Sequence, residues 1–101
     1  MVRLTLQTRL VLRVLVAADA PQYGLQLADS CGLRSGSIHP ILARLESAGW
    51  VRSQWEEIDE SEAKRRRRRF YVLTPQGIRE AAAIEHEDRS RKGWTIHPVS
   101  R

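Results

Sequence analysis

The chain has 101 residues, of which 42% are hydrophobic, and carries a formal net charge of +5. This length fits one compact domain, and no apolar run approaches the ~20 residues of a membrane span. The N-terminus lacks the segment order of a signal peptide, and Cys31 is the only cysteine, so we expect a cytoplasmic protein without an intrachain disulfide or a membrane partner. The basic charge favours an anionic partner without distinguishing DNA from RNA.

Two helices are predicted at the start of the chain. Residues 5–18 hold no Gly or Pro, and their Leu and Val side chains surround more than one narrow stripe. We therefore expect this helix to be buried on two sides, the second being a subunit contact. It ends before Pro21, because the residue before a proline avoids helical geometry. A second helix of about two turns follows over residues 23–31, with Gly32 as its left-handed stop.

The clearest helical pattern follows, where four apolar residues at i, i+3, i+4 and i+7 form one core stripe. These residues are Ile38, Ile41, Leu42 and Leu45. We expect a helix over about residues 37–48, closed by Gly49, with Ser35 or Ser37 as N-cap. Pro40 favours Ser37, since it would then be the third helical residue, where the missing N–H costs nothing.

A hairpin and a last helix complete the chain. Alternation over residues 51–56 and a β-rich run over residues 69–73 predict two strands. The polar residues 57–64 between them show no apolar period, so we expect a long, mobile tip. Thr74 as N-cap and Pro75 at the first helical position then predict the start of the last helix.

The order of these elements predicts a mainly α (α+β) fold: a winged helix-turn-helix with three helices, a β-hairpin wing and a C-terminal dimerisation helix. We place the DNA-binding domain at residues 1–74, the C-terminal helix at 75–92 and a tail at 93–101. Helix-turn-helix proteins put the N-terminal end of their recognition helix into the major groove. The sequence therefore predicts a protein that binds double-stranded DNA and regulates transcription.

Three polar residues lie at the predicted N-terminal end of the third helix and can bond base edges. They are Ser35, Ser37 and His39. The free N–H groups of this helix end also suit a phosphate. The plainer interpretation is that the serines only cap the helix and that His39 is a solvated surface residue. Arg44, off the core stripe, can reach the phosphate backbone or pair with a nearby carboxylate.

Six consecutive cations, residues 64–69, begin the second strand of the hairpin. Alternate residues of a hairpin point to opposite faces, so some of these cations can grip phosphates or enter a minor groove. We predict DNA contacts for Lys64, Arg65, Arg66, Arg67 and Arg68. Five carboxylates lie just across the hairpin: Glu56, Glu57, Asp59, Glu60 and Glu62. Cross-strand ion pairs of about 0.2–1 kcal/mol each could instead absorb several cations.

One helix-turn-helix unit reads only a few base pairs, so we expect a homodimer on a palindromic operator. Two surplus apolar surfaces can form the dimer contact. Their candidate residues are Leu6, Leu10 and Val14 on the first helix and Ile78, Ala81 and Ala82 on the last helix. We predict that the last helix packs against the first helix of the partner.

No catalytic or cofactor motif is complete. Ser35 is one position off the centre of a G-x-S-x-G elbow, and Ser90 stands where the His86-Glu87 pair would need the second His of a zinc protease. Neither a second cysteine nor a suitably spaced histidine completes a metal site. We therefore expect no enzymatic activity, no cofactor and no bound metal.

Two other functions remain open. A protein–protein interaction module, such as an antirepressor or adaptor on the same fold, would expose a hydrophobic face on the third helix, with Trp50, Trp55 and Trp94 as anchors. An RNA-binding protein would need exposed stacking aromatics, and the chain has three Trp, two Tyr and one Phe. Trp94 and the tail are the candidates to line a pocket for a small-molecule effector, and no motif supports such a pocket.

Five sequence blocks resemble the PadR-type transcriptional regulators. They are residues 4–6 (Leu-Thr-Leu), 23–24 (Tyr-Gly), 37–46, 48–51 and 70–77. The resemblance covers about residues 4–85 and implies a winged-helix fold, operator binding as a homodimer and dimerisation through the C-terminal helix. We expect a repressor, and the short subtype is the closer model because one helix and a tail follow the wing. The family usually has Thr-Ile-Tyr-Pro where this chain has Ser37-Ile38-His39-Pro40.

Overall fold

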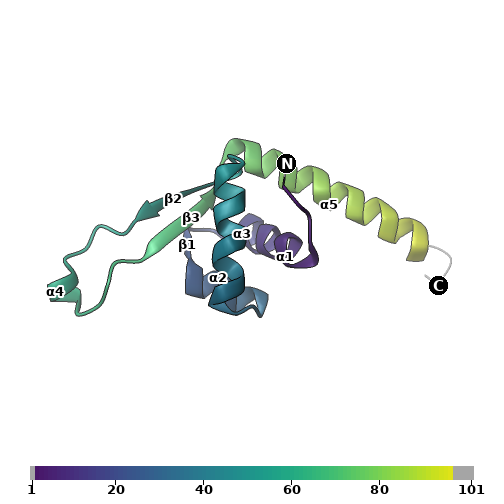
Figure 1. Ribbon diagram of the computed structural model, residues 1–101. Coiled ribbons are helices and arrows are strands. Elements are labelled where there is room, and N and C mark those ends of the chain that lie inside the picture. Colours follow the sequence, from purple (N-terminus) through teal and green to yellow (C-terminus); the bar gives the residue numbers. More distant parts are fainter. Residues whose placement is uncertain (1, 97–101) are drawn as a thin grey trace.

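The computed structural model describes residues 2–96, and it describes the side chains of residues 2–90. The elements in chain order are α1 (Leu6–Ala17), β1 (Gln22–Tyr23), α2 (Gly24–Cys31), α3 (Ser35–Ser47), β2 (Val51–Trp55), α4 (Glu60–Ala63), β3 (Arg69–Leu73) and α5 (Pro75–Ile96). Helices α1, α2 and α3 gather at the centre, while the wing (residues 51–73) and α5 project to opposite sides (Figure 1). The predicted winged helix-turn-helix is confirmed.

One hydrophobic core joins the three central helices to the sheet. All four stripe residues of α3 are at most 2% exposed, as the helical period predicted. They pack in one cluster with Val11 and Leu12 of α1 and with Leu27 of α2. Burial of a side chain of this size contributes about 1.5–3 kcal/mol, so this cluster fixes how α3 sits on the rest of the domain.

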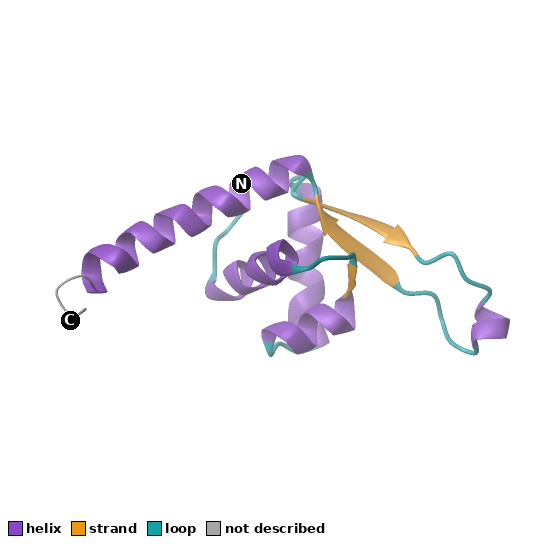
Figure 2. Cartoon of the chain, turned by 180° about the vertical axis from the view of Figure 1, so that it is seen from behind, coloured by secondary structure: helices purple, strands orange, loops and turns teal. Residues whose placement is uncertain are grey.

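The sheet has three antiparallel strands in the order β1-β3-β2. The predicted hairpin forms in register from Val51 opposite Leu73 to Trp55 opposite Arg69. Strand β1 has two residues, which pair with Phe70 and Tyr71 of β3. The sequence did not predict β1, because two residues are too few to show a period. Figure 2 shows from behind how the hairpin extends past the body of the domain.

The N-terminus of α3 differs from the expectation. The helix begins at Ser35, and Arg34 is the N-cap without a side-chain cap hydrogen bond. Neither Ser35 nor Ser37 caps the helix, because the N–H groups of Ser37 and Ile38 already bond to the carbonyl of Arg34, at 2.9 and 3.1 Å. Pro40 is therefore the sixth helical residue and costs the helix one backbone hydrogen bond.

The predicted ends of α1 and α2 are close to those observed. Thr5 caps α1, and its hydroxyl accepts a hydrogen bond from the N–H of Thr8 at 3.1 Å. Gly32 ends α2 in the left-handed region, with a φ of 69°. Only Gly32 and the two following residues separate α2 from α3, which gives the tight turn of the motif.

Helix α5 starts as predicted, with the N–H of Gly77 donating to the Thr74 hydroxyl at 3.0 Å. It continues to Ile96, past the predicted end at residue 92, because Gly93 alone does not stop it. The remainder of the predicted tail, residues 97–101, lies outside the described residues. Near its start, α5 packs on α1 through Ala81, and a two-oxygen ion pair joins Arg9 of α1 to Asp88.

The two projecting elements make the molecule long, with extents of 59 × 26 × 24 Å and a radius of gyration of 16.0 Å. A compact chain of this size would have a radius of gyration of about 13 Å. No helix in residues 2–96 has the length and hydropathy to cross a membrane.

Candidate nucleic-acid interface

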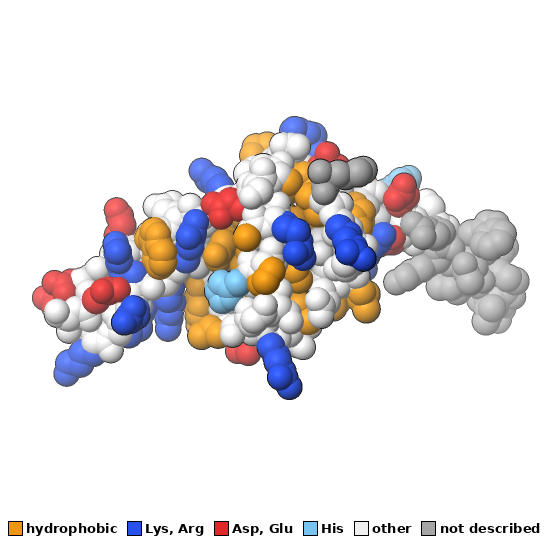
Figure 3. Space-filling view, in the orientation of Figure 1, with side chains coloured by type: hydrophobic (Ala, Val, Ile, Leu, Met, Phe, Trp, Pro, Cys, Tyr) orange, Lys and Arg blue, Asp and Glu red, His pale blue; other side chains and the backbone are white. Residues whose placement is uncertain are grey.

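The face of α3 opposite the core stripe is exposed and carries small or polar side chains. Its exposed residues are Ser35, Gly36, His39, Pro40, Ala43, Arg44 and Ser47. Figure 3 views the molecule from the side on which α3 lies in front and shows Lys and Arg side chains spread over this face and along the wing. Acidic side chains gather at the wing end of this view. No bulky apolar residue protrudes from α3, so this surface suits a polar partner.

His39 is held in a defined orientation on α3. Its Nδ1 lies 2.8 Å from the carbonyl oxygen of Ser35. A carbonyl only accepts, so Nδ1 donates in this bond, and Nε2 of the neutral ring is left as an acceptor. A Cβ at Gly24 would lie 3.3 Å from this Nε2 atom, so the ring rests against the start of α2 where a glycine leaves room. This role of Gly24 was not predicted from the sequence, although its place at a helix start could have suggested it.

The other predicted residues of α3 differ in exposure. Ser35 is exposed in the first turn, and Ser37 is half-buried beside it. Arg44 lies in the last turn of the helix and is exposed. No carboxylate of the described residues pairs with Arg44, so its guanidinium is free for a phosphate.

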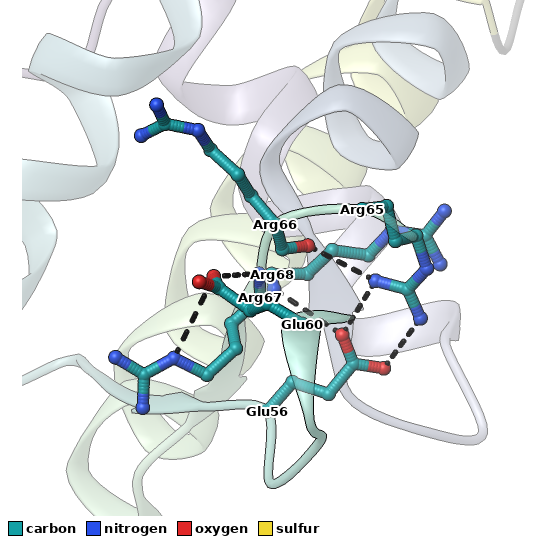
Figure 4. A network of polar contacts seen from close by, with 6 residues as sticks. All are labelled: Glu56, Glu60, Arg65, Arg66, Arg67 and Arg68. Atoms are coloured by element: carbon teal, nitrogen blue, oxygen red, sulfur yellow. Dashed lines mark hydrogen bonds and ion pairs between the residues drawn. The ribbon is translucent and has the colours of Figure 1, made fainter. Parts of the chain in front are cut away.

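Carboxylates hold part of the cation run of the wing. Arg65 donates two hydrogen bonds to Glu56, from Nη1 to Oε1 at 2.7 Å and from Nη2 to Oε2 at 3.0 Å (Figure 4). Glu56 also accepts the backbone N–H of Arg68 at 3.2 Å. These bonds, that of Arg65 first, lower the pKa of Glu56 to about 2, so this carboxylate is ionised at neutral pH. We call Glu56 and Arg65 the acid clamp.

A second carboxylate, Glu60, binds the segment that leads from α4 into β3. Its Oε2 accepts the backbone N–H of Arg67 at 2.7 Å and lies 3.9 Å from the Nε of the same residue. Both of these side chains are half exposed, at 51% and 52%. Glu60 therefore orders the backbone more than it neutralises the guanidinium.

The tip between the strands contains the short helix α4, which the polar sequence did not predict. Asp59 caps the short helix α4, and its carboxylate accepts the N–H groups of Ser61 at 2.9 Å and Glu62 at 3.3 Å. Lys64 ends the helix with a φ of 58°. No residue of α4 is buried, so the helix is held by capping and ion pairs and not by apolar packing.

Aromatic rings contact three arginines at the end of the strands that leads into the tip. The guanidinium groups of Arg67 and Arg69 lie 5.7 and 5.5 Å from the ring centre of Trp55. The guanidinium of Arg68 lies 4.4 Å from the ring centre of Tyr23. Contacts of this kind contribute about 0.5–1 kcal/mol at exposed sites and fix the direction of the arginine. Trp55, which is 51% exposed, thus serves the wing and not the core.

A polar network ties the wing to α3. The Nε of Arg69 donates to the hydroxyl of Ser53 at 2.9 Å, and this hydroxyl donates to Oε2 of Glu46 at 2.6 Å. Arg69 also lies 3.5 Å from the other carboxylate oxygen of Glu46. Since Glu46 belongs to α3, these bonds fix the base of the wing relative to the exposed face of α3.

Lys64 and Arg66 are the cations of the run that have no ion-pair or ring partner in the part of the chain that the structure describes. In Figure 4 the side chain of Arg66 points away from Glu56 and Glu60. The six cations, which the sequence presents as equivalent, therefore fall into held and free groups.

The six candidate dimer residues also differ in exposure. Leu6 and Ile78 are 73% and 56% exposed, and Ala82 is exposed as well. Leu10 and Val14 are half-buried. Ala81 is 5% exposed and packs within the core of its own chain, so it is not available to a partner. Ile78 and Ala82 line an open groove of about 390 Å³ between α1, β3 and α5.

Among the described residues, no group of three His, Cys, Asp or Glu side chains is placed to hold a metal ion. Cys31 is half-buried with a free thiol, and burial raises its pKa. The side chain of Trp94, a candidate for lining an effector pocket, lies outside the described part of the chain.

Solved structures share this fold. A protein from Streptococcus mutans UA159, smu.1704, is 23% identical with a TM-score of 0.74, the match covering 93% of this chain and 86% of that one. A PadR family transcriptional regulator from Eggerthella lenta DSM 2243 is 25% identical with a TM-score of 0.72, covering 94% and 88%. The regulator PcaV from Streptomyces coelicolor, at 20% identity and a TM-score of 0.77, is longer, and this chain covers 62% of it.

The search of curated proteins finds no match. The PadR-like family of transcriptional regulators matches residues 11–83, which include the second half of α1, helices α2 and α3, the wing and the start of α5. Members of this family are regulators and not enzymes, in agreement with the lack of a complete catalytic motif. The chain therefore belongs to the PadR-like family of DNA-binding transcriptional regulators.

Proposed function

We propose that this protein represses transcription by binding a palindromic operator in double-stranded DNA as a homodimer. The observation that carries the proposal is the exposed, polar face of α3 beside a basic wing that Glu46, Ser53 and Arg69 tie to it. A major groove is wide enough for a helix of this kind, and the wing then lies along the adjacent backbone.

In this proposal the N-terminal half of α3 reads the bases. His39 is exposed and its ring is oriented by the carbonyl of Ser35, so we expect the edge of its imidazole to contact a base in the major groove. Ser35 and Ser37 do not cap the helix, so their hydroxyls are open to base edges or phosphates. Arg44 and the wing residues 64–68 supply phosphate contacts. Lys64 and Arg66 need not give up an ion-pair or ring partner of the described residues to do so.

Exposed apolar residues support the dimer. Leu6 on α1 and Ile78 on α5 are large side chains that gain by burial, and Ala82 lets a second helix approach closely. We place the dimer contact on these three residues, flanked by Leu10 and Val14. Two copies related by a two-fold axis would set their α3 helices about 34 Å apart, one turn of DNA.

The same observations weigh against an interaction module. That function requires an apolar exposed face on α3, whereas the exposed residues there are small or polar. Trp50 packs against the core, and Trp55 lies under the arginines of the wing. A protein partner on α3 would find no aromatic anchor among these residues.

Selection of bound fragments from random duplex DNA tests the proposal. We expect a consensus of two inverted half-sites one helical turn apart, and transcription from a template carrying it should fall when the protein is added. RNA of matched length should compete poorly. Retention of no fragment, or of fragments without a shared sequence, would contradict sequence-specific binding.

A further inference from the structure

The geometry of the acid clamp matches that of an arginine on a DNA phosphate. Two N–H groups of Arg65 point at the two oxygens of one carboxylate, at 2.7 and 3.0 Å. Arginine binds a phosphate with the same fork of two parallel hydrogen bonds. Glu56 therefore occupies on Arg65 the place that a phosphate oxygen pair would take, so the carboxylate and a phosphate exclude each other there.

The clamp is firmer than the neighbouring pair. The Glu56 side chain is 18% exposed and is anchored by the backbone N–H of Arg68, whereas Glu60 is 52% exposed and lies 3.9 Å from the nearest guanidinium nitrogen of Arg67. Glu56 also remains ionised at neutral pH. Among these two carboxylates, Glu56 is thus the stronger competitor.

When Arg65 exchanges the Glu56 carboxylate for a DNA phosphate, the affinity for DNA increases little. When Arg65 leaves Glu56 for DNA, one counterion leaves the phosphate, but the freed carboxylate becomes an unpaired anion and attracts a cation in return. The affinity gain and the salt dependence that one phosphate contact brings are therefore largely cancelled at this position.

We propose that Glu56 is an intramolecular competitor of DNA phosphate for Arg65 and that it lowers the affinity of the wing for duplex DNA of any sequence. Such a competitor limits non-specific binding, which depends on phosphate contacts alone, and leaves base reading by α3 unchanged. The inference rests on the proposed DNA binding and adds a specificity-determining residue to it.

The variant Glu56→Gln tests this role. Gln keeps a carbonyl oxygen that accepts the N–H of Arg68, so the loop keeps its shape while Arg65 is released. Binding of the full chain to a random-sequence duplex, titrated between 50 and 200 mM salt, should tighten about three- to tenfold, and the slope of log affinity against log salt should steepen by close to one.

Glu57→Gln is the matched control. It changes the net charge equally at the next residue, and Glu57 is exposed without an ion-pair partner among the described residues. We expect a smaller gain in affinity and no change of slope, since no arginine is released. If both variants gain equally, the effect is one of net charge and the proposed competition is wrong.

A double-mutant cycle completes the test. In an Arg65→Ala background, Glu56→Gln should give only the small gain in affinity of Glu57→Gln and no change of slope, because the competition needs both side chains. Weaker binding by Glu56→Gln, or a full gain in affinity and a steeper slope that persist without Arg65, would overturn the proposal. Thermal melts of each variant separate these outcomes from a loss of folding. Failure of the unmodified protein to bind any duplex would instead overturn the proposed function itself.

Discussion

At the residue scale, the wing shows that a run of like charges is not one uniform patch. Arg65 is held by Glu56, while Arg68 lies on Tyr23 and Arg69 bonds to Ser53. An arginine that already has a partner must exchange it to reach DNA, so its contact contributes less than that of a free one. Counting charges overstates the electrostatic footprint of such a wing.

Arg66→Ala should therefore weaken binding to duplex DNA of every sequence alike. Loss of one phosphate contact should lower the slope of log affinity against log salt by about 0.9. Arg13→Ala is the control, because Arg13 is an exposed arginine of α1 outside the wing. Fluorescence anisotropy over a salt series measures both. An Arg66 variant with an unchanged slope would place the phosphate contacts elsewhere.

His39→Ala and Ser37→Ala should change sequence preference more than total affinity. A true base contact is worth about 1–3 kcal/mol of discrimination at its base pair. Ser37 makes no cap hydrogen bond, so its substitution should leave the free energy of unfolding nearly unchanged. Competition by operators with single base-pair changes measures the preference. Should both variants keep the original consensus, the bases are read by other residues or through DNA shape.

At the scale of elements, the long periodic segments could be predicted from the sequence. The stripe of α3 and the alternation of β2 and β3 report burial directly, because one face of each element lies in the core. Strand β1 and helix α4 were missed, since their order comes from pairing with β3 and from the Asp59 cap. The sequence also named the cations of the wing without showing which of them Glu56 and Trp55 hold.

The joint between α3, the wing and α5 depends on a glycine. A Cβ on Gly77 would lie 1.9 Å from the carbonyl oxygen of Trp50, so Gly77→Ala should push α5 away from the sheet. We expect a loss of about 1–3 kcal/mol in the free energy of unfolding, measured by urea denaturation. Gly36→Ala is the control, because its Cβ would meet no atom within 4 Å.

That control should be neutral or stabilising, by up to about 1 kcal/mol, because alanine is the better helix former. Equal stability of the Gly77 and Gly36 variants would show that α5 tolerates a shift on the sheet. The comparison therefore measures how rigidly α5 is joined to the DNA-binding domain.

At the scale of the whole molecule, a single chain leaves large apolar side chains of α1 and α5 exposed. Helix α5 has 22 residues and so extends about 33 Å. Up to Ser90 it contacts the core of its own chain through Ala81 and Ile84, and Asp88 pairs with Arg9 of α1. Large apolar side chains remain exposed on both helices, Leu6 on α1 and Ile78 on α5. An isolated small domain gains stability by covering such surface with a second copy.

Leu6→Glu and Ile78→Glu should therefore convert a dimer into a monomer. Each places a charge in the proposed contact, where burial without a partner is costly, while leaving the core residues of the chain in place. Removal of α5 is a poorer test, because loss of Ala81 would open the core. Sedimentation equilibrium should give twice 11.6 kDa for the unmodified chain and 11.6 kDa for the variants.

Leu25→Glu is the matched control for these substitutions. Leu25 is 61% exposed on α2, outside the proposed contact, so the same change there should leave the mass at that of a dimer. Because two linked half-sites bind far more tightly than one, the two monomeric variants should also lose operator binding while keeping weak, salt-sensitive binding to any duplex. A full-length chain that stays monomeric at tens of micromolar and still binds a palindrome tightly would contradict the model, since one α3 helix reads too few base pairs for that affinity.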